Sequence, residues 1–276
     1  HPDLPLTAGE YREITQNLRN VAIGNGYDTS SERYWKGWVD EVRVYDRALS
    51  TDEVLKLYKN TGNELVLYYS FDSTPENGVV ADESGYGNNG QMNGGAVYKP
   101  TDGKWQGALE LNGTDAFLFV NQAPSLNVGQ ELTFSAWYKV YDRSQTEPDP
   151  GLRQNPILDY NNAGVSGAHM WTDVIGYQWN GQGTGANLVP VTGEEDGYVI
   201  STDDQSKDVW HHLAVTYDGQ TGVGRVYVDG TLRAERQMGQ FTPQTGFDLY
   251  VGRSLGANVY LKGLIDEVRI YNRPLS

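Results

Sequence analysis

The sequence contains no cysteine, few basic residues and no long apolar stretch. Without cysteine the chain can form neither a disulfide framework nor a zinc–thiolate site. No apolar run approaches the roughly 18 residues that a membrane-spanning helix needs. Lys and Arg number 21 against 36 Asp and Glu, a formal net charge of -15, which repels nucleic-acid phosphates and anionic membranes. We therefore expect no nucleic acid and no membrane insertion, which leaves cations and neutral ligands as partners.

Methionine is also scarce, whereas glycine, tyrosine and tryptophan are abundant. The counts are 3 Met against 33 Gly, 19 Tyr and 7 Trp, a composition typical of short strands joined by tight turns. Asn-Gly and Asp-Gly pairs, as at Asn112-Gly113 and Asp229-Gly230, favour the two-residue turns of hairpins. Apolar and polar residues alternate in ELTFSAWYKV, residues 131–140, as in a strand with one buried face. The sequence therefore predicts an all-β, antiparallel fold.

One segment of fourteen residues occurs twice, as GWVDEVRVYDRALS at 37–50 and GLIDEVRIYNRPLS at 263–276, with nine identical positions. A capping box that starts at Ser50 predicts a helix directly after the first copy. Only the second copy is preceded by a long series of strand patterns. We therefore expect residues 1–60 to be the closing strands and helix of a preceding domain, and residues 61–276 to be one further domain.

Several motifs of the second region occur in a characteristic order: LVLYYSFDS, VVADESGYGNNG, LTFSAWYKV, VWHHLAVTYDG and LKGLIDEVRIYNRPLS. In this order they resemble the concanavalin A-like, laminin G-like jelly-roll domains of bacterial extracellular proteins. The resemblance implies a two-sheet antiparallel jelly-roll sandwich, preceded here by a short remnant of a second such domain. It also implies a secreted or cell-surface bacterial protein, in which such modules bind glycans or act as spacers.

A calcium site is the cofactor prediction. The string ADESGYGNNG places carboxylate and amide oxygens among glycines, which suits a loop that wraps around a hard cation. The alternative is a glycine-rich turn held by Asx hydrogen bonds. In the family this loop is often joined to the Asp of FDS and to the Asp of the closing repeat. The resemblance therefore implies calcium ligands at Asp72, Asp82, Asn88 and Asp266.

The two carboxylates of IDEVRIY are expected on opposite faces of a strand, because side chains alternate. Asp266 then lies with the buried Val268, where its carboxylate needs either a cation or a set of hydrogen-bond donors. Glu267 and Arg269 are expected to form an ion pair that faces outward.

No catalytic pattern is evident, so we expect no enzyme. No string has the carboxylate spacing of a retaining glycosidase on this fold, and Gly-x-Ser-x-Gly is missing. His211 and His212 are consecutive, so their side chains should point to opposite faces of a strand, with structural roles.

Ligand-binding residues are expected in the long, proline-interrupted segment between residues 141 and 207, since irregular loops on a rigid sandwich commonly carry function. Aromatic rings suit stacking on sugars, and amides can bond hydroxyl groups. For Trp171 and Trp179 the alternative is a place in the core, and Trp105, Trp137 and Trp210 are expected there. The candidates are Tyr160, Trp171, Tyr177, Trp179 and Asn180.

The sequence thus predicts a noncatalytic, calcium-stabilised carbohydrate-binding module of a secreted multidomain protein. Its partners would be a polysaccharide or glycan and neighbouring laminin G-like domains. The alternative is a structural or adhesive tandem repeat that binds a protein partner or acts as a spacer.

Overall fold

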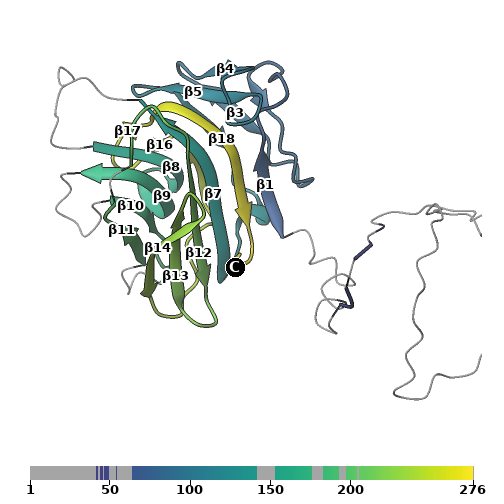
Figure 1. The fold of residues 1–276 in the computed structure, drawn as a ribbon, viewed down its shortest axis with the longest axis vertical. Helices are drawn as coiled ribbons and strands as arrows, with labels where there is room; N and C mark the ends of the chain where they lie inside the picture. Colours follow the sequence, from purple (N-terminus) through teal and green to yellow (C-terminus); the bar gives the residue numbers. More distant parts are fainter. Residues whose placement is uncertain are drawn as a thin grey trace, which may run out of the picture. The chain divides into compact units, whose positions relative to one another are not determined.

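The computed structural model describes residues 64–141, 153–175, 183–192, 197–203 and 205–275, with isolated residues at 42, 44, 45, 47–49 and 54 (Figure 1). The chain divides into two units, His1–Leu55 and Lys56–Ser276. The helix predicted after Ser50 and the first copy of the repeat fall, apart from these isolated residues, outside the described part. No helix in the described ranges is long and apolar enough to cross a membrane.

The second unit is the predicted all-β sandwich of two antiparallel sheets (Figure 1). We name the sheets after their long strands, the β7 sheet and the β8 sheet. In the β7 sheet the order is β14-β13-β12-β7-β18-β5-β4, and β1 also pairs with β18. Its strands are β1 (Leu65–Tyr69), β4 (Val97–Lys99), β5 (Ala108–Asn112), β7 (Glu131–Val140), β12 (His211–Asp218), β13 (Val223–Val228), β14 (Thr231–Gln237) and β18 (Lys262–Tyr271).

The β8 sheet has the order β11-β10-β9-β8-β15-β6-β3-β2, and a separate hairpin joins β16 to β17. A single turn of 3-10 helix, η1 (Pro124–Leu126), precedes β7. The strands are β2 (Val79–Val80), β3 (Gly90–Asn93), β6 (Phe117–Val120), β8 (Arg153–Asn162), β9 (Val165–Ile175), β10 (Gly183–Asn187), β11 (Tyr198–Ser201), β15 (Asp248–Val251), β16 (Arg253–Ser254) and β17 (Val259–Tyr260).

The core lies between the sheets and follows the predicted alternation. In β7 the side chains of Leu132, Phe134, Ala136 and Tyr138 point into the core. The residues between them face away from it, although Thr133 and Ser135 are also buried. The ring of Phe134 stacks on that of Tyr160 in β8, with centroids 6.0 Å apart, so this pair joins the two sheets. Burial of such side chains is the main source of the sandwich's stability.

A β-bulge interrupts β18 and overturns one expectation. Asp266 pairs with Trp137 of β7, but the next outward pair joins Arg269 to Ser135, so one extra residue lies between them. Glu267 takes up the extra length with a positive φ of 53°. Because directly opposed residues share a face, Asp266 lies on the outer face with Trp137. Glu267 lies on the same outer face, because it forms an ion pair with Arg269, which is opposite Ser135. The prediction that Asp266 and Glu267 occupy opposite faces is therefore wrong.

Candidate functional site

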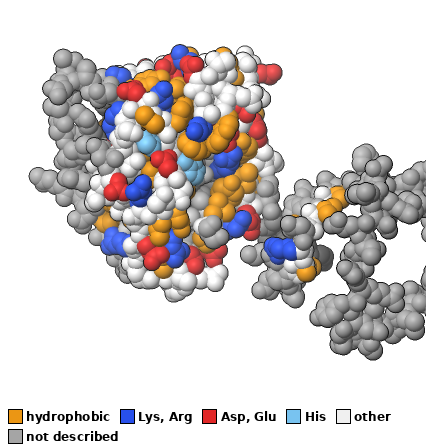
Figure 2. Space-filling view, in the orientation of Figure 1, with side chains coloured by type: hydrophobic (Ala, Val, Ile, Leu, Met, Phe, Trp, Pro, Cys, Tyr) orange, Lys and Arg blue, Asp and Glu red, His pale blue; other side chains and the backbone are white. Residues whose placement is uncertain are grey.

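A pocket of about 410 Å³ opens on the outer face of the β7 sheet. Figure 2 shows this face, with histidine side chains near its centre and hydrophobic, basic and acidic side chains around them. Four strands and the segment after β18 supply the walls. The lining residues are Thr133, Ser135, His212, Ala214, Thr216, Tyr227, Gly230, Arg269, Tyr271 and Leu275.

The pocket arises because small side chains lie between large ones in rows that cross the strands. One row runs from Tyr227 in β13 through Ala214 and Ser135 to Arg269 in β18. Neighbouring strands are about 4.8 Å apart. Because Ala214 and Ser135 are small and lie on neighbouring strands, they leave a gap about two strands wide. The large side chains on β13 and β18 flank this gap.

The second row has the same pattern and fixes the end of the pocket. Thr216 of β12 lies opposite Thr133 of β7, which lies opposite Tyr271 of β18. The Thr133 hydroxyl donates to the Arg273 carbonyl at 2.8 Å and accepts from the Leu275 amide at 2.9 Å. These two bonds hold the segment after β18 against the pocket as a wall.

A third row carries aromatic rings to the opposite end. His212 pairs with Trp137, whose ring centroid is 5.3 Å from that of the histidine. Trp105, on the loop between β4 and β5, meets Trp137 edge to face at 5.3 Å and is 49% exposed. The prediction that Trp105 and Trp137 belong to the core is wrong, because both lie on the outer face. Trp210 is half-buried.

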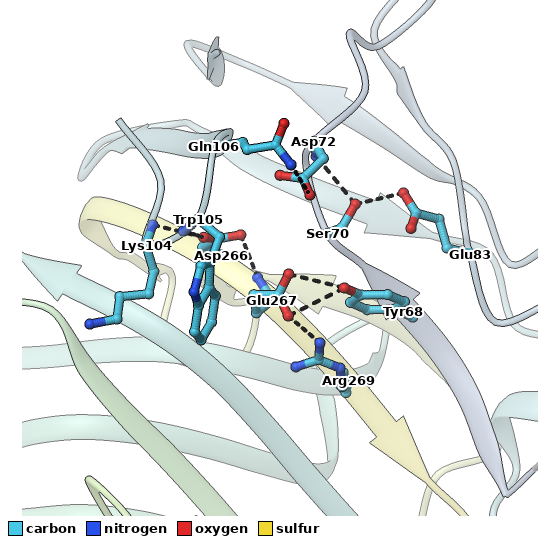
Figure 3. Close-up of polar contacts among 10 residues, drawn as sticks. All are labelled: Tyr68, Ser70, Asp72, Glu83, Lys104, Trp105, Gln106, Asp266, Glu267 and Arg269. Carbon is cyan, nitrogen blue, oxygen red and sulfur yellow. Dashed lines mark hydrogen bonds and ion pairs between the residues drawn. The ribbon is translucent and has the colours of Figure 1, made fainter. Parts of the chain in front are cut away.

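Two aspartates bind the loop that carries Trp105 (Figure 3). Asp266 Oδ2 accepts the Lys104 amide at 2.8 Å and the Trp105 amide at 3.2 Å, and its Oδ1 accepts the Glu267 amide at 2.7 Å. Asp72 accepts the Gln106 side-chain amide at 3.0 Å. The Asp266 side chain is fully buried, and this burial raises its pKa to about 7. Of the two expected ways to satisfy Asp266, the structure therefore uses hydrogen-bond donors.

Arg269 is fixed at the edge of the pocket by two contacts. It forms the predicted ion pair with Glu267, and its guanidinium lies 4.3 Å from the ring centroid of Tyr68. Glu267 also accepts the Tyr68 hydroxyl at 3.0 Å, and burial raises the pKa of Tyr68 to about 12. The ion pair leaves this end of the pocket without a strong net charge, which suits an uncharged ligand.

His212 remains mostly neutral near pH 7. Burial, and then the charge of Arg269, lower the pKa of its imidazole. A neutral imidazole has one donor and one acceptor nitrogen, so it can bond a hydroxyl group in either sense. As predicted, His211 and His212 lie on opposite faces, since they pair with Tyr138 and Trp137.

The residues predicted to bind calcium do not assemble into one site. Within the described ranges, Asp72, Asp82 and Asp266 form no group that could hold a metal ion. Asp82 instead accepts the amides of Tyr68, Ser84 and Asn88, each at 2.9 Å. This is the hydrogen-bonding pattern of the alternative, an Asx-stabilised turn. Calcium binding therefore stays a prediction from the sequence.

The predicted ligand-binding residues fall into two groups. Tyr177, Trp179 and Asn180 lie outside the described residues. Tyr160 is fully buried and Trp171 is 4% exposed, so neither ring presents a face to solvent. The expectation for these two is therefore wrong, because both rings pack inside the protein.

The pocket residues were missed although the sequence holds a signal for them. The alternation in ELTFSAWYKV already separates Thr133, Ser135 and Trp137 from the core-facing set. In the same way, Tyr227 alternates with the buried Val226 and Val228. Aromatic residues at outward positions of central strands are thus the feature that identifies this face.

Comparison with known proteins identifies the family. The family model described as the concanavalin A-like lectin/glucanases superfamily matches residues 7–55 and 112–276. Domain 4 of AbnA, a GH43 extracellular arabinanase from Geobacillus stearothermophilus solved with arabinotriose, has 20% identity and a TM-score of 0.55, over 77% of this chain and 94% of that chain. No curated protein matches the sequence.

Two further structures share the fold. The receptor-binding domain of botulinum neurotoxin type G has 16% identity and a TM-score of 0.54, and the match covers 77% of this chain and 48% of that chain. Trypanosoma rangeli sialidase in complex with sialic acid has 17% identity and a TM-score of 0.51, over 77% and 31%. The match thus spans about half of the toxin domain and a third of the sialidase. With most of its length matched by the family model, the chain belongs to the concanavalin A-like lectin/glucanase superfamily.

Proposed function

We propose that the second unit is a noncatalytic carbohydrate-binding module and that a sugar ring occupies the pocket on the β7 sheet. The observation that carries the proposal is the pair of tyrosines, Tyr227 and Tyr271, on either side of a floor of small, mostly polar residues. Tyrosine rings stack on the C–H faces of sugars, and their hydroxyls can bond sugar hydroxyls. Ser135 and the neutral His212 add further hydrogen-bonding groups in the floor.

The neighbours of known structure support this class of ligand. The arabinanase domain was solved with arabinotriose and the sialidase with sialic acid. We propose, by the same comparison, that this chain belongs to a secreted or cell-surface protein with several domains. We propose that the glycan is neutral. Arg269 is already paired with Glu267, so its charge is not available to bind an acidic sugar.

Removal of either tyrosine tests the proposal. We expect Tyr227→Ala and Tyr271→Ala each to weaken glycan binding about tenfold, since a lost stacking contact is worth about 1 kcal/mol or slightly more. A glycan array identifies the bound sugar, and calorimetry then gives the dissociation constants. Tyr250→Ala, on the outer face of the β8 sheet, is the matched control and should bind as the wild type does. Equal affinities for all four proteins would contradict the assignment of the pocket.

A hydrogen-bonded series of Ser206, His211 and Asp229 calls for a separate test of the noncatalytic proposal. His211 Nδ1 lies 2.8 Å from Asp229 Oδ2, and its Nε2 lies 2.8 Å from Ser206 Oγ, the order found in serine hydrolases. However, Ser206 is exposed and does not line the pocket, whereas acyl transfer depends on donors in a site that excludes water.

We therefore expect a fluorophosphonate probe to label the wild-type protein no faster than Ser206→Ala, as measured by mass spectrometry of the labelled peptide. Fast labelling that disappears in both Ser206→Ala and His211→Asn would contradict the noncatalytic proposal.

One observation favours a second candidate function. The family model also matches residues 7–55, which fits a second domain of the same kind before the sandwich in the chain. The domains would then form a tandem array that serves as a spacer or adhesive stalk. A wild-type protein that binds no glycan on the array would favour this function over the first.

A further inference from the structure

We infer that Trp105 forms a second sugar-binding position beside the pocket, so that the ligand is a chain of several sugar units and not a single terminal sugar. The inference rests on the proposed function and names the substrate class of the same face. The pocket between the two tyrosines does not by itself require a ligand of several sugar units, because a pocket of this kind can also bind one terminal sugar.

The exposure of Trp105 is the first observation. Tryptophan is usually highly buried, yet 49% of Trp105 is exposed on the same face as the pocket. Exposed apolar groups that form one continuous patch mark ligand-binding grooves and contact sites. The exposed part of the Trp105 ring is therefore available to contact a ligand on the outer face.

Continuity with the pocket is the second observation. His212 lines the pocket, its ring is 5.3 Å from Trp137, and Trp137 is 5.3 Å from Trp105. Each of these steps is on the scale of one sugar ring. The ammonium of Lys104 lies 4.3 Å from the ring centroid of Trp137 and covers that ring. The same ammonium lies farther from the Trp105 ring, 6.0 Å from its centroid. Trp105 is thus the more exposed aromatic surface next along the row, and Lys104 places a hydrogen-bond donor between the two positions.

The anchoring of the loop is the third observation. Asp266 and Asp72 bind Lys104, Trp105 and Gln106 of this loop (Figure 3), and Asp72 also accepts the amide of Gly107, the next residue. A fully buried carboxylate is costly, so its use here fixes the backbone of Trp105 at the expense of stability. A contact residue that is already ordered loses little entropy when it binds, which increases affinity. The loop therefore has the preorganisation expected of a binding element.

Affinity measured against chain length tests the inference. The probes are three series of neutral sugars from one to six units, arabinose to arabinohexaose, xylose to xylohexaose and glucose to cellohexaose, titrated by calorimetry. For the series that binds, we expect wild-type affinity to rise at least tenfold between one unit and three or more. Trp105→Ala should remove this gain and leave the affinity for the single sugar unchanged. Trp105→Phe should retain part of the gain, and all variants should keep the wild-type melting temperature.

Tyr227→Ala is the comparison that separates the two claims, because it should weaken binding at every chain length. Wild-type affinity that does not depend on length, or a Trp105→Ala variant that binds long chains as well as the wild type does, would overturn the inference alone. If the wild-type protein binds none of the three series and no glycan on the array, the proposed function fails, and this inference with it.

Discussion

Tyr160→Ala is expected to lower the free energy of unfolding by about 3–5 kcal/mol, the usual cost of truncating a buried aromatic side chain. The Tyr160 ring is fully buried and stacks on Phe134 of the opposite sheet, so its loss leaves a cavity between the sheets. Its hydroxyl also donates to the Leu126 carbonyl at 3.1 Å. Chemical denaturation of the two proteins measures the difference.

Tyr160→Phe is the matched control, because it keeps the ring and removes only the hydroxyl. Its cost should be about 1–2 kcal/mol, the effect of leaving one buried carbonyl without its partner. If Tyr160→Ala instead unfolds as the wild type does and loses glycan binding, the original sequence prediction of a ligand contact would be right and the assignment to the core would be wrong.

Asp266→Asn should become more stable relative to the wild type as the pH rises. In the folded protein burial raises the pKa of Asp266 from its ordinary value of 3.8 to about 7. The folded state therefore favours the protonated acid, and the stability that this contributes is lost between about pH 4 and pH 7. The change is on the order of 4 kcal/mol, at 1.36 kcal/mol for each pKa unit. Asparagine cannot ionise, so the variant does not show this loss.

The comparison requires the difference in unfolding free energy between the two proteins at several pH values, because all other carboxyl groups then cancel. Any fixed cost of the amide among the three backbone donors shifts this difference equally at every pH. Asp72→Asn is the control, since that side chain is exposed and binds the same loop. A difference for Asp266→Asn that stays constant from pH 4 to pH 8 would contradict the raised pKa.

The fold could be predicted from the sequence because its signals are local and repeated. Alternation in residues 131–140 and turns such as Asp229-Gly230 each describe a strand or hairpin without reference to distant residues. The order of the motifs, through the family resemblance, then predicted that the strands form a two-sheet sandwich. The sequence could not predict which residues of distant segments lie side by side, and the site depends on these contacts.

Two residues illustrate this limit. The bulge at Glu267 places Asp266, which precedes it, on the same outer face as Arg269, and alternation alone gives no sign of it. Trp105 was expected in the core, yet it lies on the outer face in a loop whose backbone is bound by Asp266, some 160 residues away. The hydrogen bonds from backbone amides to the carboxylates of Asp82 and Asp266 depend on the same long-range relations, and calcium binding stays a prediction.

The position of β18 has a consequence for folding kinetics. This strand pairs with β7 on one side, and with β1 and β5 on the other, so contacts between residues about 120 to 210 positions apart close the centre of the β7 sheet. Such non-local pairing slows folding, because the entropy of loop closure is lost before the contacts form. During synthesis β1, β5 and β7 emerge well before β18, with unpaired edges that can join other chains. A chain under translation therefore depends on protection from aggregation until its central strand has been made.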